Sequence, residues 1–341
     1  MNADEMKALR ESVGAACDSP GTGGWHPEAW EILAGLGVQA VSVAEEFGGA
    51  GGDLVAAEVV LSSLGTACVS VPIVETDLVA GHALEAVGVA LPSGVVTAAL
   101  AFDLDVVEVP GGRSLSGVLT RVPWGCVADC VVVLVGGAEP VLAVVEVADC
   151  TVRCGANVAG EPRDDLLLDD VFVSAAELHP IGGELIDTVR LRGAFGRAAQ
   201  IVGAAHRVYE ETVRYAGERQ QFGRPLASLQ SVQHMIAGLA GEVCAMTVVV
   251  ESAAAAVRAR PQDSWLLEVA HARVAGAAKT VAEIGHQIHG AMGFTQEHDL
   301  HLATTRLWAW RDEYRSRFDS IDSIADAVVA DDEPLWHRLT R

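Results

Sequence analysis

The pattern of apolar and polar positions divides the chain into three zones. In the first, residues 1–91, the segments Pro27 to Leu36 and Ala56 to Leu64 carry apolar residues at helical spacing between Gly-rich turns. A repeat of three and four residues is typical of helices that bury one face. We therefore predict an N-terminal α-helical domain over residues 1–91.

The middle zone, residues 92–180, is built from short Val-rich runs instead. These runs are Val95 to Ala101, Val131 to Val135, Val141 to Val147 and Asp170 to Val173. Glycine pairs and the turn Gly160-Glu161-Pro162 separate them, at the intervals expected of an antiparallel sheet. The pattern predicts a small β domain.

The last zone, residues 181–341, returns to helical spacing. Apolar residues step by three and four along two runs, Leu229 to Val250 and Ala277 to Ile288, and the Ala- and Gly-rich stretch Leu191 to Ala216 behaves alike. Breakers near Gly223 and Pro261 separate these runs, so the helices should be antiparallel. We predict a C-terminal four-helix bundle, and an α+β fold for the whole chain.

Composition narrows the function. A chain of 341 residues with 50% hydrophobic residues can bury a large core in more than one domain. Its formal charge of −23 repels nucleic acid and anionic membrane surfaces. The N-terminus is acidic, and no apolar run has the length of a membrane span. Seven cysteines, an odd number, suggest reduced thiols. We expect a cytoplasmic protein with no nucleic-acid or membrane partner.

Two cysteine pairs raise the question of a metal site. Cys126 and Cys130, and Cys150 and Cys154, are each separated by three residues, and four thiolates can bind zinc. Both pairs sit beside Val-rich runs, where cysteine usually packs as a small hydrophobic side chain. We favour this packing role, and we predict no metal site.

Three other patterns resemble functional motifs but are better explained without a functional site. Glu268-x-x-His271 and Glu283-x-x-His286 fit the di-iron pattern, but they lie 15 residues apart on one predicted helix, about 22 Å, so one metal pair cannot use both. The Gly-rich loop Glu45 to Gly52 lacks the preceding strand of a nucleotide-binding loop. His298-x-x-His301 fits a surface helix start better than a ligand pair.

Two strings near the bundle ends are more specific. One runs from Tyr215 to Leu226 and is continued by Gln230 to His234, and the other runs from Gln287 to Glu297. At these residues, and at the acidic-aromatic-Gly-Gly loop Glu45 to Gly52, the chain resembles the acyl-CoA dehydrogenase family. The resemblance covers nearly the whole chain, and it implies a flavoprotein oxidoreductase with FAD as cofactor.

The resemblance also implies a set of residues that contact the FAD of the neighbouring subunit. They are Arg219, Phe222, Gln230, Gln287, Gly290 and Ala291. Arg219 offers a planar cation suited to a pyrophosphate, and Phe222 offers a ring face. The family usually has glycine where this chain has Ala291. The alternative interpretation is that Arg219 only caps a helix and the glycines only form a turn.

The catalytic base is where the resemblance weakens. The family removes the α-proton of an acyl thioester with a carboxylate while the β-hydrogen leaves as hydride to the flavin. At the first family position the chain reads Ala309 to Ser316 without Glu-Gly-Thr, and the second falls near Gly193 with no adjacent carboxylate. Glu313 could serve after a one-residue shift, but the alternating charges around it favour a solvated, salt-bridged helix face. We predict no catalytic residue in this chain.

The β zone departs from the family as well. A Thr-Glu-Pro-like loop is absent around Leu100 to Val107, and the Trp-Ile-Thr-Asn string has become Arg121 to Cys126, where Trp124 could simply be core. These features resemble the short, base-lacking subunit of heterotetrameric, steroid-degrading bacterial acyl-CoA dehydrogenases. The implied partners are an acyl-CoA substrate, a base-containing subunit in an α2β2 complex and an electron acceptor. The alternatives are a homo-oligomeric enzyme that uses Glu313 and a homologue without flavin.

Overall fold

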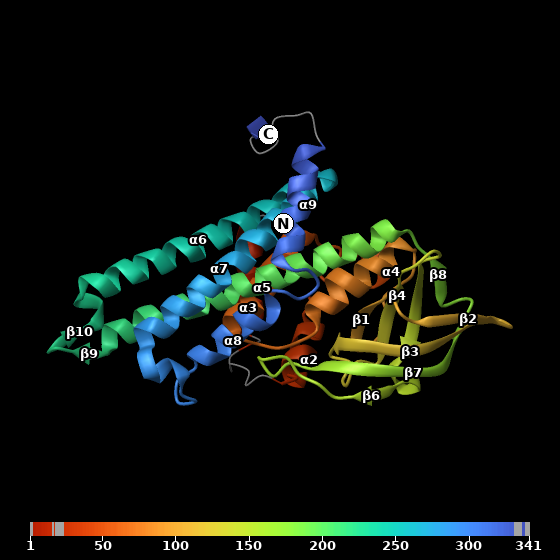
Figure 1. Ribbon diagram of the computed structural model, residues 1–341, viewed down its shortest axis with the longest axis horizontal. Coiled ribbons are helices and arrows are strands. Elements are labelled where there is room, and N and C mark those ends of the chain that lie inside the picture. Colours follow the sequence, from red (N-terminus) through yellow and green to blue (C-terminus); the bar gives the residue numbers. More distant parts are fainter. Residues whose placement is uncertain (1–2, 16, 18–23, 331–335, 338–341) are drawn as a thin grey trace.

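The computed structural model describes residues 3–15, 17, 24–330 and 336–337, and it shows a helical bundle extending from one side of a β-rich domain (Figure 1). The N-terminal helices are α1 (Ala3–Ala15), α2 (Pro27–Gly35) and α3 (Leu54–Ala67), with a short turn η1 (Glu45–Phe47). Helix α3 begins after Asp53, whose carboxylate accepts hydrogen bonds from the amides of Val55 and Ala56 at 2.9 and 3.0 Å. This side chain satisfies two amides that the first turn leaves free.

A π-helical segment, η2 (Val74–Gly81), continues directly into α4 (His82–Ala86). It is buried along its whole length although it contains Glu75 and Asp77. The Asp77 carboxylate accepts hydrogen bonds from the amide and hydroxyl of Ser42, at 2.8 and 2.9 Å. Buried carboxylates need such partners, and those of Glu75 are described with the site below.

The middle zone forms two four-stranded sheets. Their strands are β1 (Val96–Ala101), β2 (Asp105–Val109), β3 (Gly112–Pro123), β4 (Cys130–Val135), β5 (Val141–Glu146), β6 (Thr151–Arg153), β7 (Arg163–Ser174) and β8 (Leu178–Pro180). The first sheet has the order β1-β4-β5-β8 and the second β2-β3-β7-β6. All pairs are antiparallel except β1 with β4, which is parallel because β2 and β3 form part of the other sheet between them. The antiparallel expectation is wrong for that one pair.

The last zone is helical. Its helices are α5 (Gly183–Glu218), α6 (Gln230–Ala259), α7 (Trp265–His289), α8 (Leu300–Trp310) and α9 (Arg317–Val329), with a hairpin of β9 (Gln220–Gln221) and β10 (Arg224–Pro225) between α5 and α6. Short turns are η3 (Val147–Asp149), η4 (Leu226–Ser228), η5 (Pro261–Asp263) and η6 (Gly290–Phe294). Helix α5 packs against α6, α7 and α8, and also against α3 and η2. It therefore carries side chains into both halves of the molecule.

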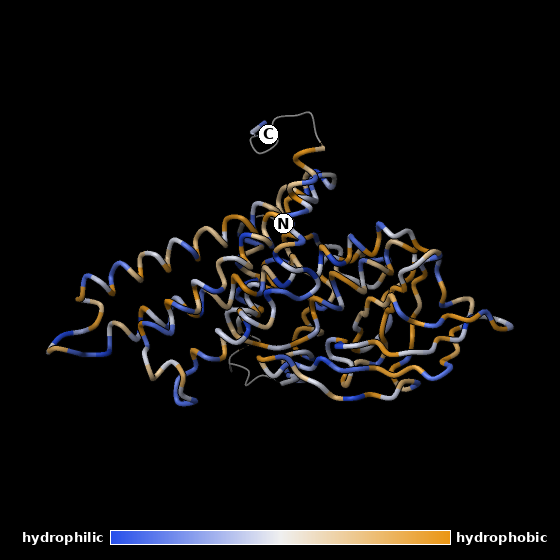
Figure 2. Tube along the Cα trace, viewed as in Figure 1, coloured by the Kyte–Doolittle hydropathy of each residue, from blue (hydrophilic) through white to orange (hydrophobic). Residues whose placement is uncertain are grey.

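The predicted fold is confirmed: N-terminal helices, central sheets and a C-terminal bundle follow one another. Figure 2 shows hydrophobic residues recurring at intervals along the long helices and along the strands. The domain limits at residues 91 and 180 stay a prediction; the first strand begins at Val96, and α5 begins at Gly183. Helix α6 is long and apolar enough to cross a membrane. Length and composition alone are weak evidence for a membrane span, and α6 packs against α5 and α7.

Candidate functional site

The residues that the family resemblance singled out gather at one end of the bundle, where α5 ends, α6 begins and α7 ends (Figure 1). Arg219 follows the last residue of α5, and Phe222 and Gly223 form the tight turn of the β9–β10 hairpin with φ angles of 55° and 76°. Gln230 is the first residue of α6, and Gln287 lies in the last turn of α7. Gly290 and Ala291 follow in η6, where Gly290 has a φ of 58° that favours glycine.

Packing beneath this surface holds the two strings together. The ring of Tyr215 stacks on that of His289 with centroids 4.4 Å apart, and its hydroxyl donates to the His289 carbonyl at 3.4 Å. Ala216, Val232 and Ile288, one from each helix, form a small apolar core directly below. The sequence could predict each string, but this contact fixes them relative to one another.

An open groove of about 650 Å³ runs beside the second string. Its walls include Gln287, Gly290, His286, Phe294 and Trp308. Phe294 is 74% exposed and stacks on the His286 ring at 4.3 Å, and Trp308 is partly exposed. No cofactor role was assigned to His286, Phe294 or Trp308 from the sequence. Phe294 lies in the second string, where it is the aromatic residue that follows the Gly-x-x-Gly turn.

The groups at the bundle end suit an anionic ligand that carries aromatic rings. The Arg219 side chain is exposed and makes no ion pair within the described part of the chain. Phe222 is 88% exposed. Nδ1 of His286 is buried at the groove without a hydrogen-bond partner in the described residues. A free cation, uncovered rings and an orphaned polar atom are the groups that a dinucleotide such as FAD would engage.

The second region of interest is the buried centre of the molecule, where Glu313 lies. This residue follows α8 and belongs to no helix. Its carboxylate accepts hydrogen bonds from Nε and Nη2 of Arg163, both at 2.8 Å, and from Nε of Arg197 at 2.7 Å. Arg197 pairs in turn with Glu75 of η2. The predicted solvated helix face at Glu313 is therefore wrong: Glu313 joins the β domain at Arg163 to the bundle at Arg197.

Tyr314 occupies the space beside this ion pair. Its hydroxyl donates to Glu75 at 2.8 Å, and its ring lies over the Arg197 guanidinium, 5.9 Å from the ring centroid. Its ring also lies so close to Gly193 that a β-carbon on residue 193 would be 2.8 Å from it. The family resemblance gave two positions for a base, the segment Ala309 to Ser316 and the region of Gly193. These two segments lie next to each other, and the Tyr314 ring occupies the space between them.

Electrostatics make Glu313 a poor base. Burial alone would raise the pKa of its carboxyl, but Arg163 and Arg197 outweigh burial and lower it to about 2. Both carboxylate oxygens already accept hydrogen bonds from guanidinium groups. A base works best with a pKa near the working pH, so this carboxylate has little tendency to take a proton.

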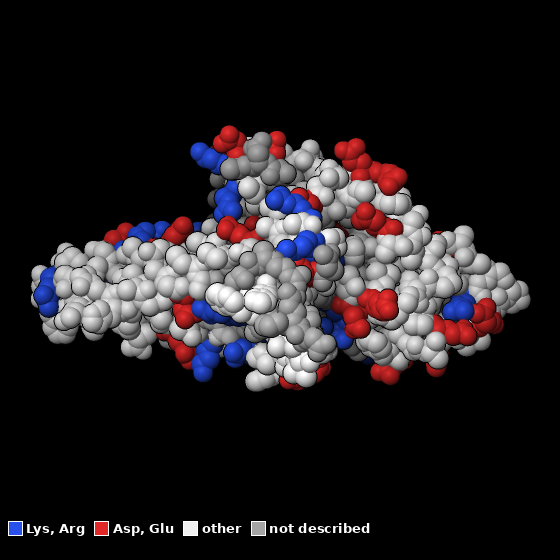
Figure 3. Space-filling model, turned by 90° about the horizontal axis from the view of Figure 1, so that it is seen from above, with Lys and Arg blue, Asp and Glu red and all other residues white. Residues whose placement is uncertain are grey.

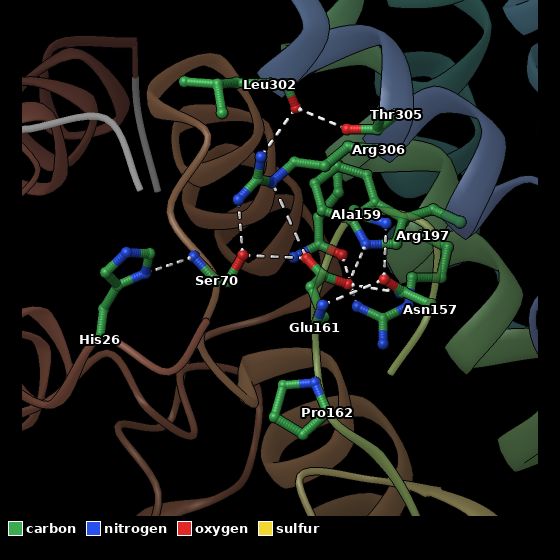
Figure 4. Close-up of polar contacts among 12 residues, drawn as sticks. His26, Ser70, Asn157, Ala159, Glu161, Pro162, Arg197, Leu302, Thr305 and Arg306 are labelled. Atoms are coloured by element: carbon green, nitrogen blue, oxygen red, sulfur yellow. Dashed lines mark hydrogen bonds and ion pairs between the residues drawn. The ribbon is translucent and has the colours of Figure 1, made fainter. Parts of the chain in front are cut away.

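The network continues through Glu161, which is fully buried between the domains (Figure 4). Oε1 of Glu161 accepts from the Ser70 hydroxyl at 3.0 Å, and Oε2 accepts from Trp310 Nε1 at 2.8 Å and from Arg163 at 3.2 Å. Arg306 of α8 donates to the Ser70 hydroxyl at 2.8 Å. We call the whole set the junction network. Its ionic members are Glu75, Glu161, Glu313, Arg163, Arg197 and Arg306, three negative and three positive.

A cavity of about 320 Å³ adjoins the junction network. It is lined by β1 and β3 and by Arg163, Glu313 and Tyr314. Trp124, next to β3, is 1% exposed and donates its indole N–H to Glu75 at 3.1 Å, which confirms the interpretation as a core residue. Sequence reasoning missed Glu75, Arg163 and Arg197; the available signal was a charged residue, Arg197, within the Ala- and Gly-rich run Leu191 to Ala216.

The candidate metal ligands do not converge. Within residues 3–15, 17, 24–330 and 336–337 no group of three or more His, Cys, Asp or Glu side chains could hold a metal ion. Glu268, His271, Glu283 and His286 all lie on α7, as predicted. Nδ1 of His271 contacts the Ser320 hydroxyl at 2.9 Å, and Nε2 of His286 contacts that of Thr304 at 3.0 Å.

Comparison with known families accounts for most of the chain. Residues 5–90 match the acyl-CoA dehydrogenase N-terminal domain, and residues 187–310 match the acyl-CoA dehydrogenase C-terminal domain. The acyl-CoA dehydrogenase IpdE2 of Mycolicibacterium smegmatis is 30% identical over 87% of this chain and 86% of its own length. Its counterpart in Mycobacterium tuberculosis is 31% identical, covering 82% and 80%.

Solved structures show the same fold. The ChsE4-ChsE5 complex from Mycobacterium tuberculosis superposes with a TM-score of 0.86 at 21% identity, over 98% of this chain and 99% of the other. The butyryl-CoA dehydrogenase from Megasphaera elsdenii gives 0.89 at 17% identity, covering 96% and 99%. FAD is the cofactor of this family, whose members are oxidoreductases acting on CH–CH bonds. The matched domains, the relatives and the bundle-end strings together establish that this chain belongs to the acyl-CoA dehydrogenase family.

Proposed function

We propose that this chain is the base-lacking subunit of a heteromeric, FAD-dependent acyl-CoA dehydrogenase that desaturates an acyl-CoA thioester between Cα and Cβ. The base comes from a related partner chain in an α2β2 complex. The substrate is an acyl-CoA of the steroid-degrading class, and a separate electron-transfer partner reoxidises the flavin. The complex works in the cytoplasm.

The observation that carries this proposal is the state of Glu313. A carboxylate between Arg163 and Arg197, with its pKa lowered to about 2, is a structural anion and not a proton acceptor. Tyr314 fills the space beside it, against Gly193. Removal of a general base typically costs about 10²–10⁴ in rate, so a chain with this centre needs a partner for turnover.

The bundle end is the part of this chain that serves the cofactor. Bound FAD would supply the acceptor for the substrate's β-hydride. Arg219 would pair with the pyrophosphate, Phe222 would cover a ring, and Gln230 and Gln287 would hydrogen-bond polar edges. At Gly290 and Ala291 the backbone can approach the ligand closely. All six residues are exposed in the single chain, as expected of groups that reach into a neighbouring subunit.

The need for a different partner is supported by charge and by relatives. The exposed side of α6 carries uncharged residues such as Ala237, Gly241 and Val248. In Figure 3 the part of the helical bundle that extends to the left has few charged side chains on the face shown. Two copies of a chain with charge −23 repel each other, so a less acidic partner fits better against it. Structural neighbours include the ChsE4-ChsE5 complex and the Tcur3481-Tcur3483 steroid dehydrogenase, each named for two chains.

The test is purification of the chain alone and together with a base-containing acyl-CoA dehydrogenase encoded nearby. Light scattering and the ratio of flavin to protein are measured on both samples, followed by dye reduction with acyl-CoA substrates. We expect the single chain to be poorly flavinated and inactive, and the pair to form an α2β2 complex with fewer than one FAD per chain.

Two results would contradict the proposal. An active homotetramer with one FAD per chain, inactivated by Glu313→Gln, would establish the self-sufficient enzyme. A complex that stays colourless in the presence of FAD would favour a homologue that has lost the flavin. Absorbance in the flavin bands separates these outcomes.

A further inference from the structure

Three of the seven cysteines are exposed: Cys126, Cys154 and Cys244. Cys244 lies alone on α6, whereas the other two belong to loops at the same edge of one sheet. Cys130 is buried in β4 and Cys150 is half-buried. Each cysteine pair suggested by the sequence, Cys126 with Cys130 and Cys150 with Cys154, therefore has only one exposed member. The two exposed members, Cys126 and Cys154, lie in neighbouring loops.

The sheet order explains why these two cysteines approach each other. Strand β7 lies between β3 and β6, with Pro123 of β3 opposite Arg163 and Arg153 of β6 opposite Asp165. Cys126 lies three residues beyond Pro123, and Cys154 directly follows Arg153. Both loops therefore pass the same end of β7.

A buried carboxylate at that end holds both loops. Asp164 is fully buried, and its Oδ2 accepts a hydrogen bond from the Cys126 amide at 2.7 Å while Oδ1 accepts from the Gly155 amide at 3.0 Å. The loop at Cys126 is further closed by hydrogen bonds from the amides of Val127 and Ala128 to the Trp124 carbonyl, both at 3.0 Å. One side chain thus fixes the backbone at both thiols.

We propose that Cys126 and Cys154 form a thiol–disulfide modification site, oxidised by exchange with a small-molecule disulfide. The Cys154 thiol loses its proton to solvent, and the thiolate attacks one sulfur of that molecule, forms a mixed disulfide and releases one thiolate, which takes up a proton. The Cys126 sulfur then loses its proton to solvent and attacks Cys154, which expels the second thiolate. Two electrons pass from the protein sulfurs to the small disulfide, which leaves as two thiols.

The roles of the two sulfurs follow from their surroundings. Burial first, and then the Asp164 carboxylate and the nearby Cys154, raise the pKa of the Cys126 thiol to about 11. A thiol is a poor nucleophile while protonated, so Cys154 reacts first with the external disulfide. Cys126 then reacts within the molecule, where proximity compensates for its low thiolate fraction.

The disulfide would link two loops that both contribute side chains to the junction network. The Cys126 turn contains Trp124, whose indole donates to Glu75. The Cys154 loop continues to Asn157 and Glu161, whose side chains are 2.9 Å apart at Nδ2 and Oε2. A cross-link between the loops restricts the unfolded chain, so oxidation should raise the thermal midpoint as well as remove the thiols.

The experiment equilibrates the full-length chain in glutathione buffers from fully reduced to fully oxidised, traps thiols with acid and N-ethylmaleimide, and maps the cysteines by mass spectrometry. We expect a Cys126–Cys154 linked peptide pair, the loss of two alkylatable thiols and a higher thermal midpoint. Cys126→Ser should stop the reaction at a glutathione adduct on Cys154. Cys154→Ser should leave Cys126 reduced.

Cys244→Ser is the matched control, because it removes an exposed cysteine outside the site and should leave the linked pair unchanged. The proposal is overturned if wild-type protein carries glutathione on Cys154 while Cys126 stays alkylatable at every buffer ratio. It is equally overturned if Cys126→Ser shows no more stable Cys154 adduct than wild type. Circular dichroism of both variants verifies that the loops have not unfolded.

Discussion

The ring of Tyr314 lies directly over Gly193 of α5, so close that a β-carbon there would be 2.8 Å from two ring atoms. Gly193→Ala should therefore force the partly buried ring out of place. We expect a loss of about 1–3 kcal/mol in the free energy of unfolding, the usual range for overpacking. Urea denaturation followed by circular dichroism measures it.

Gly238→Ala is the control for that substitution. Gly238 lies in α6, and a β-carbon there meets nothing within 4 Å. The better helix propensity of alanine should stabilise this variant by about 0.5–1 kcal/mol in the isolated chain. If both alanine variants change the stability in the same direction, the Tyr314 contact does not restrict residue 193.

Replacing Glu313 separates a structural role from a catalytic one. Glu313→Gln leaves Arg163 and Arg197 without their shared anion, and breaking a buried pair typically costs about 3–5 kcal/mol. Turnover per folded complex should stay unchanged. Asp312→Asn is the control: its side chain is 48% exposed and, among the described residues, forms an ion pair only with Arg311 at the surface, so we expect at most about 1 kcal/mol. Lost turnover with unchanged stability would mark Glu313 as the base.

The contribution of Glu58 in α3 to the stability of the chain should fall as the pH rises toward neutrality. Burial, and then the Glu251 carboxylate, raise the pKa of Glu58 from 4.5 to about 7. A raised pKa in the folded state means that the protonated form is favoured. The stabilisation is therefore complete below pH 4.5 and is lost as the pH rises through about 7. A shift of this size corresponds to at most about 3 kcal/mol.

Glu58→Gln keeps a neutral, hydrogen-bonding side chain at every pH. Relative to the wild type, this variant should therefore become more stable as the pH rises from 5 to 8. Glu28→Gln, on the exposed side of α2, is the control and should keep the wild-type pH dependence. An unchanged slope for Glu58→Gln would contradict the assignment.

Flavin binding should depend on Arg219 across the subunit interface. A charge-assisted hydrogen bond is typically worth about 1.5–3 kcal/mol, so Arg219→Ala should weaken FAD binding roughly ten-fold or more in the assembled complex. Arg153→Ala, an exposed arginine on β6, should leave the affinity unchanged. Titration of the apo complex with FAD, monitored by flavin fluorescence, measures both. Equal affinities would remove Arg219 from the cofactor site.

The sequence alone predicted the elements whose pattern is local. The repeat that begins at Leu229, the residue before α6, continues along α6 from Val232 to Val250, and the Val-rich run Val131 to Val135 lies within β4. The family strings were also readable, because they are contiguous and their glycines have special backbone angles, as at Gly290. The strand β3 was not predicted, because most of its residues are exposed or half-buried, its buried residues Leu115, Leu119 and Val122 are widely spaced, and it carries few valines.

The centre of the molecule was decided only by tertiary structure. Alternating charges around Glu313 predict a solvated face when only neighbours in sequence are considered. Its actual partners, Arg163 and Arg197, lie 150 and 116 residues away. A repeat shows which side of an element is polar, but it does not show what that side packs against. A buried charge is tolerated only where the fold brings opposite charges to it, so Glu313 changes from a surface residue to a structural anion through contacts that no local pattern contains.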